Sequence, residues 1–213
     1  MKKPFAIITM LLLVLSVAGC AEKPAPIPPA PEREQADGVA DDAAKEQNVV
    51  FPDANTENKS MSATMRSTVI PTDLQDMEDK ASNVVLCTVT DDSESETFES
   101  GLVLSYAGVT VEKVIKGALS EGDVLNITET GTRFEDHDAS IDGVPLLRKG
   151  MRVVLFLHDK TEQGRYGIVA NYYGKLFVDG DGLVYPPSYF SARAGTISGF
   201  TEPMPLDKLL QSD

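Results

Sequence analysis

The pattern of apolar and polar positions divides the chain into three stretches of different character. Residues 5–15 are almost entirely apolar, residues 21–70 are mostly polar, and residues 71–213 alternate short apolar runs with turn residues. Short runs of this kind, bounded by Gly, Asn and Asp, are typical of β-strands. In the third stretch they occupy residues 84–89, 102–115, 124–128, 151–157, 166–170, 175–178 and 183–185.

These runs predict an all-β fold for residues 71–213, a small OB-like barrel or sandwich of about seven strands. The run 151–157 is the most apolar and is expected at the centre of the sheet. Gly108 is expected to mark a bend or a bulge. The turn Asp179-Gly-Asp-Gly182 joins the last two runs and predicts a hairpin.

One or two short helices are expected to flank the strands. Residues 72–81 have apolar side chains at helical spacing, and Thr72 is placed to cap the N-terminus. Residues 205–210 favour one or two further helical turns at the end of the chain.

Residues 20–70 predict a disordered tether. Five prolines lie between Pro24 and Pro31, which favours extended polyproline II, and an Ala-rich, acidic stretch with few aromatic residues follows. The apolar cluster Val49-Val50-Phe51 is too short to fold alone. In an alternative that the residues leave open, part of 60–71 packs on the domain as a first strand, using Arg66–Ile70.

Charge excludes one class of partner. The chain has 33 acidic and 19 basic residues, a formal charge of −14, which becomes −16 (−14 minus 2) if Lys2 and Lys3 are removed. Nucleic-acid binders carry a basic surface that neutralises phosphates. We therefore expect no nucleic-acid partner.

The N-terminus is typical of an export signal. Lys2 and Lys3 precede the apolar run 5–15, which is shorter than the ~20 residues of a membrane-spanning helix. The motif Val17-Ala-Gly-Cys20 resembles the lipobox of bacterial lipoproteins. That resemblance implies a signal peptide over residues 1–19, cleavage between Gly19 and Cys20, and a diacylglyceryl group on the Cys20 thiol.

A diacylglyceryl group supplies two acyl chains, enough for stable anchoring. The resemblance thus implies a protein held at the extracytoplasmic face of the cell membrane, with the membrane as a partner through the Cys20 lipid. In a Gram-negative cell, the absence of Asp at position 21 would imply sorting to the outer membrane.

A second resemblance covers roughly residues 81–185. The segments 81–89, 111–117, 122–127 and 147–157 resemble a domain of uncharacterised exported proteins of Gram-positive bacteria, which is thought to be OB-like. Val153 stands where that family usually has an aromatic residue. The shared motifs are structural, so the resemblance implies a fold and no functional residues.

Few residues point to chemistry. Ser120 lies in a relaxed nucleophile-elbow pattern, but a strand and not a helix follows it. His137 stands among Glu135, Asp136 and Asp138, and His158 ends a strand; neither has a second His at metal-binding spacing.

The remaining candidates concern binding. Arg133, His137, Tyr172 and Tyr173 could line a ligand face. Neighbouring strand residues point to opposite sides, so only one of the two tyrosines is expected inside, and a place in the core is favoured for that one. Asp179 and Asp181 echo part of a calcium loop, although no distal Glu follows. Cys87 has no partner cysteine once Cys20 is lipidated, and we expect it in the core.

We therefore expect no cofactor, apart from weak calcium association, and a non-catalytic binding or interaction module for an unidentified envelope or protein partner. An envelope hydrolase using an unmarked Ser with a His, or the acidic loops with His137, is the alternative, and a calcium-associated structural protein is a third.

Overall fold

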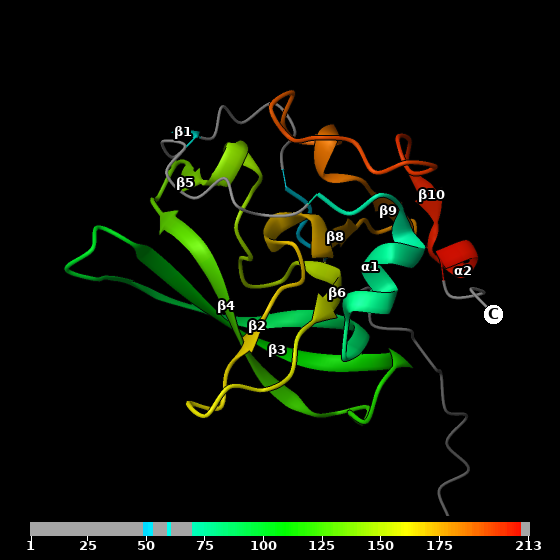
Figure 1. The fold of residues 1–213 in the computed structure, drawn as a ribbon, viewed down its shortest axis with the longest axis horizontal. Helices are drawn as coiled ribbons and strands as arrows, with labels where there is room; N and C mark the ends of the chain where they lie inside the picture. The colour runs from blue at the N-terminus through cyan, green and yellow to red at the C-terminus, as the bar shows by residue number, and fades with distance from the viewer. Residues whose placement is uncertain (1–48, 53–58, 61–69, 210–213) are drawn as a thin grey trace, which may run out of the picture. The chain divides into compact units, whose positions relative to one another are not determined.

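The computed structural model describes residues 49–52, 59–60 and 70–209, and within them the fold is all-β, as predicted (Figure 1). The expected signal peptide with its cleavage site at Gly19, the expected lipid-bearing Cys20 and most of the expected tether lie outside the described residues. No helix of the described part is long and apolar enough to cross a membrane. The elements are β1 (Lys59–Ser60), α1 (Leu74–Lys80), β2 (Asn83–Thr97), β3 (Val103–Lys116), β4 (Val124–Arg133), β5 (Asp138–Ser140), η2 (Ile141–Gly143), β6 (Arg152–Leu157), β7 (Tyr166–Gly167), η3 (Asn171–Gly174), β8 (Lys175–Val178), β9 (Leu183–Tyr185), η4 (Pro187–Tyr189), β10 (Met204–Pro205) and α2 (Leu206–Leu209).

The strands pair in the order of a partly open Greek-key barrel. β2 pairs antiparallel with β3 on one side and with β6 on the other, and β3 pairs with β4. The short β7 runs parallel to β4, and a bridge between Leu157 and Ile168 links its far side to the end of β6. The barrel is not closed by a continuous ladder, because β7 has only two residues. This order is that of an OB-like barrel, with β8, β9 and β10 extending the sheet beyond β6.

β6 is an interior strand of the sheet, next to the middle strand β2, and is as deeply buried as its sequence predicts. Residues 153–157 are all buried, because β2 and β8 cover the two edges of β6 and both of its faces meet apolar side chains. β8 and β9 have the predicted bounds and form the predicted hairpin, with Val178 opposite Val184.

The N-cap of helix α1 lies one residue later than expected. Asp73, and not Thr72, is the N-cap: its Oδ1 accepts the backbone N–H of Asp76 at 2.7 Å. The Asp76 carboxylate in turn accepts the backbone N–H of Thr72 at 2.9 Å, so the two acidic residues satisfy donors on both sides of the cap. Met77, on the apolar face, is fully buried and fixes the helix to the barrel.

The β2–β3 hairpin extends beyond the apolar run that predicted β2. The expected strand 84–89 continues to Thr97 through polar residues, which pair with the first half of β3. The register shifts between Val89 and Asp91, opposite Gly108, where the sequence predicted a bulge or bend. Polarity alone did not end the strand, because a long partner strand supplies the backbone hydrogen bonds.

Two short pieces of the expected tether contact the domain: β1, which pairs parallel with β5, and the segment at Val50 and Phe51. The backbone N–H of Val50 donates to Gly150 O at 3.0 Å, and Val50 forms a parallel bridge with Met151. The Phe51 ring packs on Tyr185, with 4.6 Å between ring centroids. The cluster 49–51, too short to fold alone, is thus ordered by the domain against which it packs.

Candidate functional site

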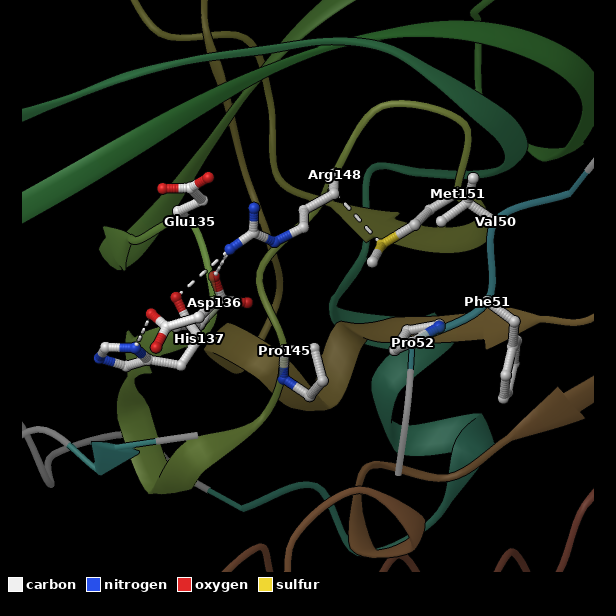
Figure 2. A pocket seen from close by; sticks show the side chains of 10 residues that line it. Val50, Phe51, Pro52, Glu135, Asp136, His137, Pro145, Arg148 and Met151 are labelled. Carbon is white, nitrogen blue, oxygen red and sulfur yellow. Dashed lines mark hydrogen bonds and ion pairs between the residues drawn. The ribbon is translucent and has the colours of Figure 1, made fainter. Parts of the chain in front are cut away.

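A pocket of ≈ 220 Å³ lies where the segment 50–52 meets the loop after β4 (Figure 2). Figure 2 shows Arg148 reaching toward Asp136 and His137 on one side, with Met151 and Val50 on the other. The pocket therefore has one charged end and one apolar end. Its lining residues are Val50, Phe51, Pro52, Glu135, Asp136, His137, Asp138, Pro145, Arg148 and Met151.

Arg148 is held in place through one of its nitrogens. Nη2 donates to Asp138 Oδ1 at 2.7 Å, to Phe134 O at 2.6 Å and to His137 O at 3.3 Å. Asp138 is itself buried and accepts the backbone N–H of Leu146 at 2.8 Å. Within the described part of the chain, Nε and Nη1 of Arg148 have no hydrogen-bond partner. The guanidinium is thus fixed in orientation and retains donors for a ligand.

The acidic residues of the loop after β4 differ in their environment. Glu135 and Asp136 are exposed, whereas Asp138 is paired with Arg148. The Asp136 carboxylate lies 2.6 Å from Nδ1 of His137, whose ring stacks on Phe134 at 4.7 Å. Nε2 of His137 is buried and has no hydrogen-bond partner among the described residues. Among the described residues, no Ser, Thr or Cys lines this pocket.

Arg133, predicted on a ligand face, does not line the pocket. Its Nε donates to Leu147 O at 2.8 Å and its Nη2 contacts Glu129 Oε1 at 3.2 Å. The same carboxylate accepts the backbone N–H of Leu147 at 2.8 Å and pairs with Lys175. Arg133 therefore belongs to a buried network beneath the pocket that fixes the backbone of residues 145–147.

The prediction that only one of Tyr172 and Tyr173 points inward was wrong. The strand expected over 166–170 ends at Gly167, and both tyrosines lie in the 3-10 helix η3, where period-two alternation does not apply. Both are buried and stack on each other at 4.4 Å. The Tyr172 hydroxyl donates to Asp142 Oδ2 at 2.9 Å, and burial, followed by bonds to Tyr173 and Asp142, raises the pKa of Tyr172.

The calcium candidates Asp179 and Asp181 form a hairpin turn. Asp179 Oδ1 accepts the backbone N–H groups of Asp181 and Leu183, and Oδ2 accepts the Tyr185 hydroxyl at 2.7 Å. Asp181 is exposed. The described residues contain no group of three or more His, Cys, Asp or Glu side chains placed to hold a metal ion.

A second pocket, of ≈ 630 Å³, lies between β4 and the start of η3 and includes His158 and Lys80. Its charged side chains are engaged in the fold: Lys80 pairs with Asp76 at 2.7 Å and Glu129 with Lys175. Ala170 and Asn171 on its rim have φ angles of 50° and 60°, a left-handed turn that directs the chain into η3.

Ser120, the residue of the nucleophile-elbow pattern, lies in an exposed turn. Its backbone N–H donates to the Asp123 carboxylate at 2.8 Å.

Sequence reasoning placed His137 in the candidate site but missed Arg148 and the segment 50–52. The apolar cluster 49–51 within a polar stretch was the available signal. No family model and no curated protein matches this chain.

Proposed function

We propose that this chain is a membrane-anchored, extracytoplasmic lipoprotein whose β-domain binds a small molecule in the pocket around Arg148 without catalysing a reaction. The observation that carries the binding proposal is the guanidinium of Arg148, which is fixed by Asp138 and two carbonyls and keeps unpartnered donors at the pocket. A few fixed polar groups beside an apolar wall are the usual composition of a small-molecule site.

The proposed anchor rests on the lipobox residues and is tested independently of the pocket. Cells expressing the chain are labelled with radioactive palmitate and fractionated. Label on the protein and recovery in the membrane fraction support the anchor, and both depend on Cys20. A Cys20→Ser variant that still carries the label and remains membrane-bound contradicts it.

The binding proposal is tested by blocking the pocket. The full chain, extracted in detergent, is titrated calorimetrically with a panel of small apolar carboxylates, amines and amino acids. Val50→Trp places a large ring at the pocket and should abolish binding, while its backbone bridge to Met151 remains. Val124→Trp, at an exposed position outside the pocket, is the matched control. Binding that Val50→Trp leaves unchanged, or no saturable binding by any member of the panel, contradicts the proposal.

An envelope hydrolase is the second candidate, and the contact between His137 and Asp136 is the observation that favours it. It requires a nucleophile or an activated water within reach of His137. Turnover of an envelope ester or peptide by the purified chain, abolished in His137→Asn, would replace the binding proposal with this one.

A further inference from the structure

We propose that the pocket around Arg148 takes a small zwitterion with an apolar side chain, of the size of a free amino acid such as leucine. This inference rests on the proposed binding function and adds the chemical class of the ligand.

The charges at the pocket have both signs. Arg148 presents donors that suit a carboxylate, and Asp138 already neutralises part of its charge through Nη2. Glu135 lines the same pocket as an exposed carboxylate, and Asp136 adds a second negative charge next to His137. The exposed carboxylate of Glu135 suits an ammonium group.

A ligand with a single charge leaves one part of this arrangement unused. A simple carboxylate would bind Arg148 but would be repelled by Glu135 and Asp136. A simple amine would be attracted by the two carboxylates but would face the guanidinium and leave its donors unpaired. A zwitterion pairs with both, and its own charges lie close together, as the shared lining of one small pocket requires.

The other end of the pocket suits an apolar side chain on the ligand. Val50, Phe51, Pro52, Pro145 and Met151 provide a wall without charged groups. A volume of ≈ 220 Å³ lies below the ~300–1,000 Å³ of sites for drug-sized ligands, which indicates a compact occupant. An aliphatic side chain entering this end would gain free energy from burial.

A matched series of three ligands tests the inference. Leucine carries both charges, leucinamide lacks the carboxylate, and 4-methylpentanoate lacks the amine, while all three keep the same side chain. We expect the full chain in detergent to bind leucine roughly tenfold to hundredfold more tightly than either analogue, since each analogue loses one charge-assisted pairing. Glu135→Gln removes the carboxylate proposed to bind the ammonium group. This variant should weaken the binding of leucine and should not weaken the binding of 4-methylpentanoate. Glu99→Gln, an exposed carboxylate in the β2–β3 turn, controls for the change in net charge.

The outcomes separate this inference from the binding function itself. If an analogue binds as tightly as leucine and Val50→Trp abolishes that binding, the pocket is a binding site but not for zwitterions. Leucine binding that Glu135→Gln and Glu99→Gln weaken equally also overturns the inference. If no ligand of the series or the wider panel binds, the binding proposal fails as well.

Discussion

The ammonium group of Lys175 pairs with the carboxylate of Glu129 in the interior of the domain, where the two side chains are only 2% and 3% exposed. Lys175 also donates to Pro145 O at 2.6 Å, and Glu129 accepts from Leu147 N and Arg133. The pair thus connects β4 and β8 to the segment 145–147, which leads into Arg148. The buried charges fix the backbone beneath the candidate pocket.

Removing one partner of this pair should be strongly destabilising. Glu129→Gln leaves the Lys175 ammonium buried without a counter-charge, and Lys175→Met leaves Arg133 as the remaining cation paired with Glu129 among the described residues. We expect each single variant to lower the free energy of unfolding by ~3–5 kcal/mol, and the double variant by clearly less than the sum. Urea unfolding followed by circular dichroism measures all three. Additive losses would show that the two charges do not depend on each other.

The hydrogen bond between Tyr185 and Asp179 predicts a dependence on alkaline pH. The bond to the Asp179 carboxylate, with burial as a smaller cause, raises the pKa of Tyr185 to about 12 from its ordinary value near 10. Because the pKa is higher in the folded state, the stabilisation is complete below pH ~10 and is lost as the pH rises toward 12.

Absorbance titration measures this shift, since the chain has no Trp. The difference between the wild-type chain and Tyr185→Phe should show one tyrosine ionising near pH 12. In Asp179→Asn that ionisation should move toward pH ~10, whereas Asp159→Asn, in an exposed loop, should leave it unchanged. An unaltered titration in Asp179→Asn would mean that burial, and not the hydrogen bond, holds the proton.

Cys87 should be unreactive in the folded protein. It is fully buried in β2, its thiol donates to Val153 O at 3.6 Å, and burial raises the pKa of the thiol. In a Cys20→Ser background, Cys87 is the only thiol. A disulfide reagent should therefore label it only as fast as the domain unfolds. Ser100→Cys, in the exposed β2–β3 turn, should be labelled at once, and equal rates at the two positions would contradict the prediction.

The sequence predicted the elements in which local pattern and tertiary packing agree. β6, β8 and β9 and the Asp179 turn are short apolar runs with a turn of strong preference, and they form as expected. The polar half of β2 was missed because its pairing depends on β3. Tyr172 and Tyr173 were misplaced because Ala170 and Asn171, both with φ in the left-handed region, end the strand pattern. Asn is enriched in that conformation, but Ala rarely adopts it, so the pair does not mark the turn clearly.

The candidate site was predicted only in part, for a related reason. His137 and its acidic neighbours are adjacent in sequence, so composition revealed them. Arg148 and Val50 reach the same pocket through contacts distant in sequence: the salt bridge to Asp138, and the bridge between Val50 and Met151. No local pattern contains those contacts.

Gly117 directly follows β3 and has a backbone conformation that side-chain-bearing residues rarely adopt. Its φ is +105°, and a Cβ there would lie 2.2 Å from Asn83 Oδ1, the atom that accepts the backbone N–H of Ala118 at 3.1 Å. Gly117→Ala should therefore strain the backbone at this φ and also break the hydrogen bond between Ala118 and Asn83. Gly122, with φ +86° and open space around it, isolates the backbone contribution. We expect Gly122→Ala to cost ~1–3 kcal/mol of unfolding free energy, and Gly117→Ala to cost ~1–3 kcal/mol more because the Asn83 acceptor is displaced. Thermal and urea unfolding of the two variants measure this difference, and equal losses would mean that Gly117 is required for its φ alone.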